Sequence, residues 1–172
     1  MKLNKFSLLF SAVIGLFLAV SAFAQTEKFS DANVEYGFDL PNAAWKMTSK
    51  PSTTSPNVEY VYGDRSAGYL EVRKLTVKAD DLMSEIVGGE EEKLKFLQGY
   101  VAGKEENFSG NLKGTAFNFE FIRSGRNMSG RFYFLKANPT TVYVLRFTAQ
   151  KEKLITIRNQ TDSIARTFEL KK

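Results

Sequence analysis

The amino-acid sequence predicts an α+β fold, in which an antiparallel β-sheet of about six strands is flanked by helices. One observation is a series of short stretches in which apolar residues alternate at period two. Another is an enrichment in aromatic residues, which make up 13% of the chain and suit pleated surfaces. The third is a set of segments whose apolar residues recur every three or four positions, the spacing of an amphipathic helix.

The first element along the chain is a secretory signal peptide, which we place at residues 1–24. Two lysines give it a basic start, and an apolar run follows from Leu8 to Val20. Ala22-Phe23-Ala24 is a small-x-small cleavage site, so the predicted cut lies after Ala24. The apolar run is shorter than the ~20 residues that cross a hydrocarbon core, which favours cleavage over a retained anchor. The protein is then periplasmic or extracellular, with no integral membrane span after cleavage.

Residues 25–172 are predicted to form a single α+β domain, the natural count for this length. The signal holds two lysines and no acid, so the net charge falls from +5 for the whole chain to +3 after cleavage. A domain of this size buries enough surface to fold without disulfides, which suits a chain with no cysteine. A charge this small on an exported protein argues against a nucleic-acid partner.

The strands are predicted from their alternation. They are expected at residues 34–40, 58–62, 69–77, 117–121, 131–136 and 141–148. The last two runs are apolar on both faces, which places them in the centre of the sheet. Between Val72 and Leu75 the apolar residues change face, and we interpret this as a β-bulge near Arg73. Short connections rich in Gly, Asn, Ser and Pro predict hairpins between sequential antiparallel strands.

Two helical segments are predicted, one between the strands and one after the last strand. Residues 80–101 carry apolar side chains at helical spacing, and Gly88-Gly89 is expected to break them into two pieces. Glu90, Glu91 and Glu92 would open the second piece, where the helix dipole favours negative charge. Residues 151–167 predict an amphipathic helix lying on the sheet. Residues 48–57, rich in Ser, Thr and Pro, predict a mobile surface loop or the rim of a binding site.

The absence of histidine and cysteine excludes several kinds of chemistry. Ser-His-Asp and Cys-His catalysis, imidazole or thiolate metal sites and a disulfide framework cannot be built. The sequence also lacks a G-x-G-x-x-G dinucleotide loop, a G-K-[ST] phosphate cradle and a G-x-S-x-G motif. We therefore predict a non-enzymatic protein with no cofactor and no metal site.

The candidate binding residues are basic and aromatic. Arg123, Arg126 and Arg131 flank a predicted turn, and Arg73 and Arg146 are candidates to join them on the same sheet. Such a patch can meet a carboxylate, a phosphate or an anionic lipid headgroup, or it can keep a solvated hairpin from edge pairing.

Trp45 is the only tryptophan of the chain. It is expected to fill the core near the first strand, with a ligand-stacking platform as the alternative.

The run Tyr36-Gly37-Phe38-Asp39-Leu40-Pro41, followed by Trp45, resembles the start of PsbP/Mog-type domains. The similarity extends over nearly the whole chain after residue 24 and ends at Ile164-Ala165-Arg166-Thr167-Phe168, where the family often has Ile-x-x-Ser-Phe. These domains occur in plant photosystem-II extrinsic proteins, in a Ran-binding nuclear-transport factor and in many exported bacterial proteins of unknown role. The resemblance implies an α/β/α sandwich around an antiparallel sheet.

The individual functions of this family do not carry over to the chain. The metal sites of the plant members rely on histidine, which is absent, and Ran binding belongs inside eukaryotic cells. The resemblance implies, at the level of the fold, a domain that binds another macromolecule and catalyses nothing. We predict an exported, non-enzymatic binding or accessory domain of the bacterial envelope, whose partner is an unidentified protein or envelope component. The hairpin Arg123–Arg131 and the loop at 48–57 are the candidate contact rim.

Two other functions stay open on the sequence alone. An apolar pocket between sheet and helix, lined by Phe117, Phe119, Phe121, Tyr143 or Phe147, would make the protein a small-ligand carrier. Two carboxylates facing each other about 5–10 Å apart in a cleft would make it a hydrolase. The acidic residues Asp80, Asp81 and Glu85 cluster at a helix start, however, which is typical of N-terminal capping.

Overall fold

The computed structural model describes residues 26–171. The predicted signal peptide, residues 1–24, and its cut after Ala24 lie outside the described residues. Within residues 26–171 no helix has the length and apolar character that crossing a bilayer requires.

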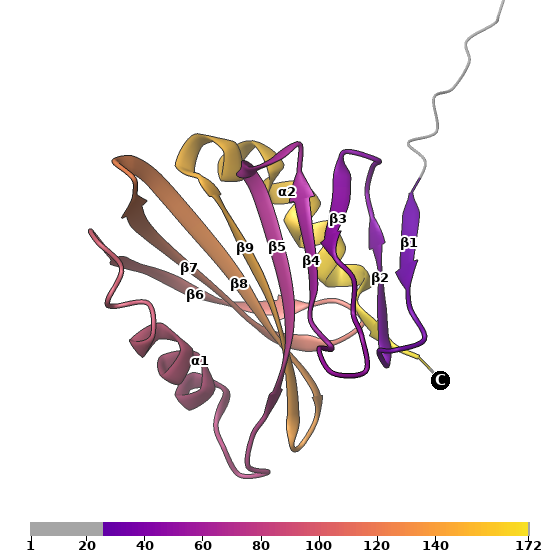
Figure 1. Cartoon of the computed structure of the whole chain (residues 1–172). Coiled ribbons are helices and arrows are strands. Elements are labelled where there is room, and N and C mark those ends of the chain that lie inside the picture. The colour runs from indigo at the N-terminus through magenta and orange to yellow at the C-terminus, as the bar shows by residue number, and fades with distance from the viewer. Residues whose placement is uncertain (1–25, 172) are drawn as a thin grey trace, which may run out of the picture.

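A seven-stranded antiparallel sheet forms the centre of the molecule (Figure 1). In spatial order its strands are β3 (Trp45–Ser49), β4 (Val58–Tyr62), β5 (Asp64–Thr76), β9 (Thr141–Gln150), β8 (Arg126–Asn138), β7 (Lys113–Arg123) and β6 (Val101–Ser109). Two meanders, β3-β4-β5 and β6-β7-β8-β9, meet where β5 pairs with β9. The predicted antiparallel sheet is confirmed, but its strands differ from the expected set. Residues 45–49 and 101–109 add two strands that were not predicted, and the strand predicted at 34–40 lies outside this sheet.

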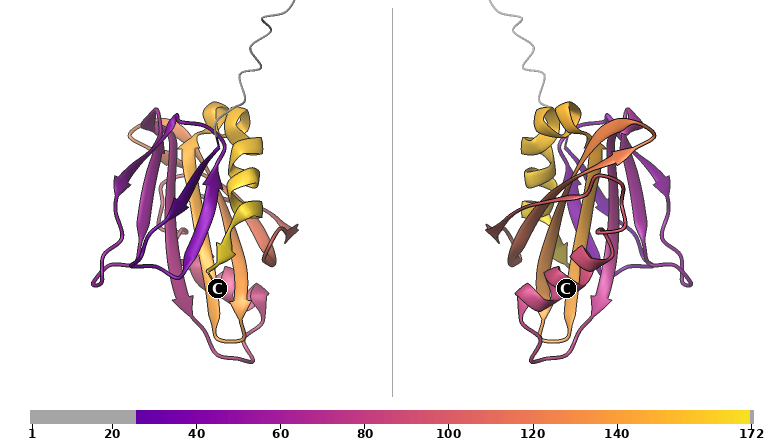
Figure 2. Two further views of the ribbon diagram at one scale, coloured as in Figure 1. Left: turned by 90° about the vertical axis from the view of Figure 1, so that its right-hand side faces the viewer. Right: turned by 90° about the vertical axis from the view of Figure 1, so that its left-hand side faces the viewer.

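A second layer covers one face of this sheet. It consists of helix α2 (Lys151–Thr167) and a small antiparallel sheet of β1 (Glu27–Ser30), β2 (Tyr36–Leu40) and β10 (Glu169–Leu170). Figure 2 shows α2 running along this face, and α1 (Met83–Glu92) packs against the opposite one. Phe168, fully buried at the end of α2, stacks with Tyr36 at a ring-centroid distance of 5.1 Å. The C-terminal segment therefore completes the core around β2.

The two faces of the sheet carry two separate apolar cores. On β9, Tyr143, Leu145 and Phe147 belong to the core beneath α2. Val142 and Val144, between them, belong to the core beneath α1. This arrangement confirms that β8 and β9 are central strands, with both faces covered where α1 packs on them.

The bulge predicted near Arg73 is wrong. β5 pairs with β9 without interruption from Tyr69 to Thr76. Leu70 and Val72 face the core beneath α2, whereas Leu75 packs on the core beneath α1. The strand passes from one covering layer to the other, so its buried face changes although its register does not.

The division of residues 80–101 into two helices is also wrong. A single helix, α1, includes Gly88 and Gly89 and ends at Glu92. Val87, fully buried, anchors this helix on the sheet, and packing outweighs the low helix propensity of the two glycines. Turns follow, and residues 101–109 form the edge strand β6. The second predicted helix, 151–167, agrees with α2 at both ends.

Glu35 connects the small sheet to the large one. Its carboxylate accepts a hydrogen bond from the Tyr143 hydroxyl at 2.6 Å and one from Lys74. These bonds, that of Lys74 first, lower the pKa of Glu35 from its ordinary 4.5 to about 2. The carboxyl group thus stays charged in the folded protein at pH values where it is protonated in the unfolded chain.

Glu35→Gln is expected to lower the free energy of unfolding by about 1 kcal/mol at pH 7, a value reduced for solvent screening because the side chain is 48% exposed. A lowered pKa stabilises above the unfolded value, so this difference between the two proteins should shrink as pH falls from 4.5 toward 2. Urea titrations across this pH range measure it. Glu105→Gln, at an exposed carboxylate of β6, is the control, and a constant difference for Glu35→Gln would contradict the assignment.

Candidate functional site

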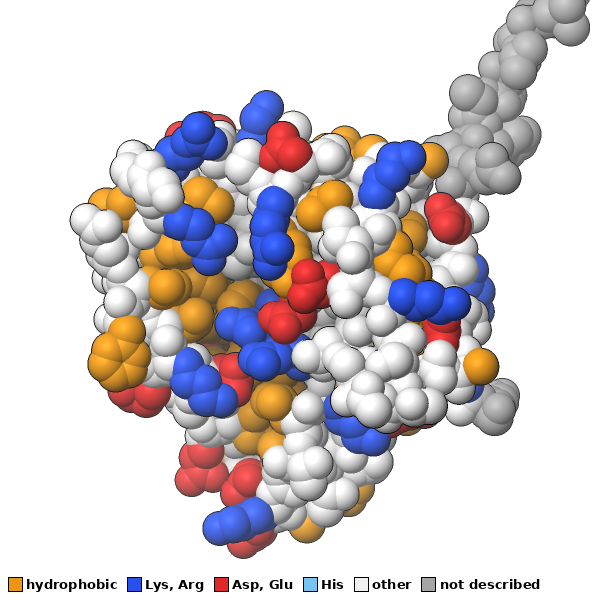
Figure 3. Space-filling model, viewed as in Figure 1, with side chains coloured by type: hydrophobic (Ala, Val, Ile, Leu, Met, Phe, Trp, Pro, Cys, Tyr) orange, Lys and Arg blue, Asp and Glu red, His pale blue; other side chains and the backbone are white. Residues whose placement is uncertain are grey.

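Helix α1 covers only part of its face of the sheet. In Figure 1 it lies beside the lower left of the sheet, away from the upper halves of β5, β8 and β9. Five of the eight arginines of the chain lie on this uncovered part, which we call the arginine face: Arg65, Arg73, Arg123, Arg126 and Arg146. Figure 3 shows basic side chains around a hollow on this side of the molecule, with acidic ones beside them.

Arg146 lies at the centre of the arginine face. It stands on the middle strand β9 in register with Phe132 of β8, and its guanidinium carbon lies 4.7 Å from the Phe132 ring centroid. Its Nη1 donates to a Glu71 carboxylate oxygen at 3.0 Å. Its Nε is buried and has no hydrogen-bond partner among the described residues. The rest of the side chain is thus fixed while donors of the guanidinium remain uncommitted.

Arg123 of β7 and Arg65 of β5 lie near Arg146 of β9. Arg123 and Arg126 pair across a two-residue turn, Ser124-Gly125, whose φ angles of 51° and 72° suit a tight hairpin. The guanidinium of Arg123 lies over Phe121, 5.2 Å from the ring centroid. Arg65, at the start of β5, lies 4.2 Å from the Tyr69 ring centroid.

These side chains surround two adjoining hollows. The first, which we call the arginine hollow, has a volume of about 360 Å³ and is lined by Arg65, Arg123, Arg146, Glu59, Glu71, Tyr69, Phe132 and Thr148. The second has a volume of about 280 Å³ and shares Arg65 and Arg123 with the first, while Arg126 and Met128 complete its wall. No lysine lines either hollow.

Positive charge exceeds negative charge on this face. Glu71 is bound by Arg146 at 3.0 Å and by Arg73 at 3.3 Å, and Glu59 lies 4.0 Å from Arg65. Five arginines therefore face two glutamates, a surplus of three positive charges. The whole chain after residue 24 has the same surplus, so the remaining surface is balanced overall. An anionic partner would be attracted to this face in particular.

Arg131, which the sequence placed with Arg123 and Arg126, lies on the opposite face of the sheet. It is 5% exposed, and it donates to Tyr133, Asp162, Glu106 and Asn118 at 2.7–3.1 Å. Arg131 lies five residues after Arg126 and three after Met128 on β8, so the alternation of side chains along the strand points it to the other face of the sheet. The expectation that the three arginines share one surface patch is corrected: two do, and Arg131 is a buried structural cation.

Trp45 is a core residue. It is 2% exposed, its ring packs on Tyr62 and Phe147, and its Nε1 donates to Gln160 at 3.0 Å. Because the ring is buried, Trp45 cannot be a ligand-stacking platform, and the prediction that it fills the core is the correct one.

The two segments of the predicted contact rim lie at opposite ends of the sheet. The loop at 48–57 leads into β4 at Val58, which pairs with Val72 of β5. The hairpin at Arg123 lies instead beside Arg65, at the other end of β5. Its neighbour there, Arg65, was missed by the sequence analysis, because this first part of β5 precedes the residues that alternate between apolar and polar.

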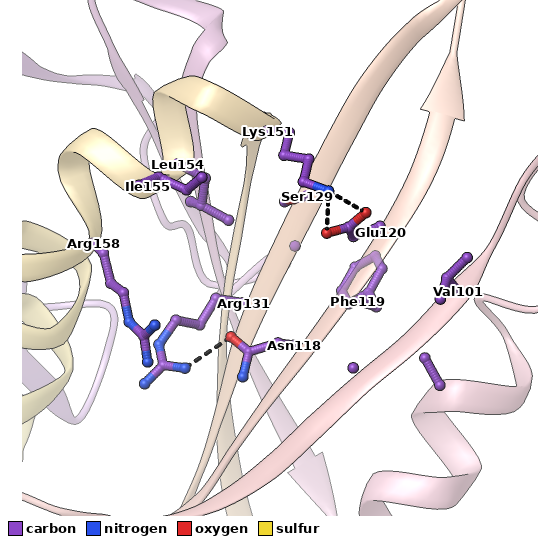
Figure 4. A pocket seen from close by; sticks show the side chains of 13 residues that line it. Val101, Asn118, Phe119, Glu120, Ser129, Arg131, Lys151, Leu154, Ile155 and Arg158 are labelled. Carbon is purple, nitrogen blue, oxygen red and sulfur yellow. Dashed lines mark hydrogen bonds and ion pairs between the residues drawn. The ribbon is translucent and has the colours of Figure 1, made fainter.

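A third hollow, of about 380 Å³, opens on the α2 face between the helix and the β6–β7 edge (Figure 4). Exposed Ile155 and Val101 lie on its two sides. Its cations are matched by acids: Lys151 binds Glu120 at 2.7 Å, and Arg158 binds Glu106 at 3.3 Å. This groove is therefore less suited to a charged ligand than the arginine hollow.

The acidic cluster at α1 is held in local interactions. Asp81 accepts from the Lys78 amide at 2.8 Å, and Glu85 accepts from the Leu82 amide at 2.9 Å, as expected for capping. Glu90 lines a hollow with these two acids but is bound to Lys93. Within residues 26–171 no group of three or more His, Cys, Asp or Glu side chains is placed to hold a metal ion.

The aromatic residues proposed for an apolar pocket do not share one. Phe117, Phe119 and Phe121 belong to the core beneath α1, whereas Tyr143 and Phe147 belong to the core beneath α2. All five are only 1–2% exposed. The sheet itself separates the two groups, so they cannot line a common carrier cavity.

No known family profile matches the chain, and no curated protein sequence matches it. Solved structures do. The cyanobacterial PsbP of Synechocystis sp. PCC 6803 is 12% identical with a TM-score of 0.55, and the match covers 91% of this chain and 98% of that one. LpqN of Mycobacterium tuberculosis, described as involved in cell envelope biogenesis, is 15% identical with a TM-score of 0.56, covering 86% and 92%. A point mutant of protein Mog1 is 11% identical with a TM-score of 0.62, covering 85% and 96%.

At these identities the matches establish the fold. A seven-stranded antiparallel sheet with a smaller sheet and two helices, similar in arrangement to these three proteins, is a PsbP/Mog-like α+β fold. The resemblance that the sequence suggested from Tyr36 to Phe168 is thereby confirmed at the level of structure.

Proposed function

We propose that this PsbP/Mog-like domain is an exported, non-enzymatic binding or accessory domain of the bacterial envelope, which contacts a negatively charged protein or envelope surface through the arginine face. The observation that carries the proposal is the surplus of three positive charges on the part of a sheet face that α1 leaves uncovered among the described residues. Arginine is well suited to such contacts, because its planar fork binds carboxylate and phosphate groups bidentately.

Two further observations support an accessory role in the envelope. LpqN, which shares the fold, is described as involved in cell envelope biogenesis. Residues 1–24 have the features of a cleaved signal, which would deliver the domain to the periplasm or the medium. Mass spectrometry of the protein exported after expression of the full chain tests this directly, with Gln25 as the expected first residue.

Reversing the charge at the hairpin is expected to abolish partner binding. The immobilised exported protein should retain an envelope component that the double variant Arg123→Glu, Arg126→Glu does not retain, because that variant changes the local charge by four units. Lys104→Glu with Lys153→Glu, at exposed cations of β6 and α2, is the matched control and should retain it. Binding should also weaken with added salt, since exposed charges are screened. Equal retention by both double variants would refute the proposed contact surface.

A further inference from the structure

We propose that the arginine hollow is a recognition site for a phosphate group. The inference rests on the proposed function, since it assigns a ligand chemistry to the same face. Arg65, Arg123 and Arg146 reach this hollow from three different strands, β5, β7 and β9. A tetrahedral phosphate can present separate oxygens to three such donors, whereas a planar carboxylate has two oxygens in one plane.

Arg146 has the character of a binding residue rather than a structural one. It occupies the central strand of the sheet, where the neighbouring residues on the same face, Val142 and Val144, are fully buried and apolar. Its Nη1 alone has a partner among the described residues, and its Nε is buried without one. A buried unpaired donor is unfavourable in the folded protein, so a sequence selected only for stability would place an apolar residue there.

The three guanidinium groups are held in place before any ligand arrives. Each lies over an aromatic ring, with guanidinium-carbon to centroid distances of 4.2, 5.2 and 4.7 Å for Arg65, Arg123 and Arg146. Such stacking restricts side chains that are otherwise flexible, and it reduces the entropy that a ligand must overcome. Thr148 adds a hydroxyl group to the lining.

Two glutamates, Glu59 and Glu71, line the hollow and determine how much negative charge a ligand can bring into it. Glu71 is neutralised by Arg146 and Arg73, and it keeps Arg146 directed across the sheet. Glu59 is held less closely, 4.0 Å from Arg65. The arginine face as a whole retains three positive charges, enough for a phosphate monoester or diester. Glu59 opposes that ligand, so its neutralisation should tighten binding.

The test is a calorimetric titration of the exported protein with inorganic phosphate at low ionic strength. We expect a dissociation constant of about 1 mM or tighter. Arg123→Gln, at an exposed position, and Arg146→Lys, which keeps the charge but loses the fork, should each weaken binding about tenfold. Glu59→Gln should tighten it about threefold. Arg158→Gln, on the α2 face, should leave it unchanged, and circular dichroism verifies that each variant is folded.

Vesicles distinguish the source of the phosphate group. Sedimentation with vesicles containing phosphatidylglycerol, but not with pure phosphatidylcholine, together with competition by inorganic phosphate, would identify a lipid headgroup. Phosphate binding without sedimentation would identify a soluble phosphate compound. The proposal is overturned if the wild-type protein shows no binding at about 10 mM phosphate, ten times the expected constant. It is also overturned if Arg123→Gln and Arg146→Lys bind as the wild type does.

The outcomes separate this inference from the proposed function. Loss of envelope binding in the charge-reversed hairpin variant, without any phosphate binding, would overturn the phosphate site and leave the contact surface standing. If the wild-type protein binds phosphate but the charge-reversed hairpin variant still retains the envelope component, the contact surface is overturned and the phosphate site stands.

Discussion

Replacing Arg131 with alanine should lower the free energy of unfolding by about 3 kcal/mol, because it removes the central cation of a buried network. The Arg131 side chain is 6% exposed and meets two carboxylates, those of Asp162 and Glu106, at 3.1 Å. Asp162 also accepts a hydrogen bond from Tyr133, whose burial raises the pKa of its hydroxyl well above the usual value. Without Arg131, the partly buried Asp162 carboxylate and the buried Tyr133 hydroxyl keep the cost of leaving water. They lose the positive charge that offsets this cost.

Arg158→Ala is a closely matched control for this variant. Arg158 donates to the same Glu106 oxygen at 3.3 Å, but its side chain is 52% exposed. Its loss should cost about 0.5 kcal/mol or less. Urea unfolding of both variants measures the contrast, and a double-mutant cycle between Arg131 and Asp162 should give a coupling above about 1 kcal/mol. Similar losses for the two arginines would show that burial does not determine the strength of this network.

Gly114→Ala is expected to destabilise the protein by about 3 kcal/mol or more, since the added methyl group has no space. A Cβ at this position of β7 would lie 1.7 Å from the carbonyl oxygen of Phe134 on β8. Phe134 is fully buried in the central sheet, so its backbone cannot move aside without disturbing both cores. We expect a variant that is poorly folded at 37 °C, as measured by circular dichroism and thermal unfolding.

The same substitution in α1 should have the opposite effect. A Cβ at Gly89 would have no atom within 4 Å, and the residue is exposed in a helix interior. Gly89→Ala should therefore stabilise the protein by about 0.5–1 kcal/mol, the difference in helix propensity between the two residues. If Gly114→Ala unfolds at the same urea concentration as the wild type, the close contact between β7 and β8 is not as described.

The sequence predicted best where one rule determined the structure. Helix α2 agrees at both ends because its apolar stripe and the polar residues around it follow a single period. The central position of β8 and β9 followed from residues that are apolar on both faces, which only covered strands tolerate. These are local patterns with a direct physical meaning, and no long-range information was needed.

The errors arose where tertiary structure decides between local alternatives. Strand β6 reads Val-Ala-Gly-Lys-Glu-Glu-Asn-Phe-Ser and has one buried residue, Phe108, so no alternation identifies it. It is a strand because it pairs with β7. The face change in β5 came from a change of covering layer, which an isolated strand cannot reveal.

The candidate site shows the same division. Arg123 and Arg126 were identified correctly as neighbours, because a hairpin is a local feature. Arg131 was misplaced because its direction depends on the strand alternation beyond the turn, and Arg65 was missed because only the folded sheet brings it to Arg123. The uncommitted donors of Arg146 depend on Glu71, its pairing partner on the adjacent strand β5, and they are visible only in three dimensions.

The last residues of the chain also bear on how the protein comes to be folded. Phe168 packs against both Tyr36 and Tyr143, and β10 pairs with β2. The rings near the start of the domain thus stay uncovered until Phe168 and β10 have been synthesised. Native packing around β2 therefore cannot be complete while the residues before Phe168 are still being added, and this core of the nascent domain stays partly open until then.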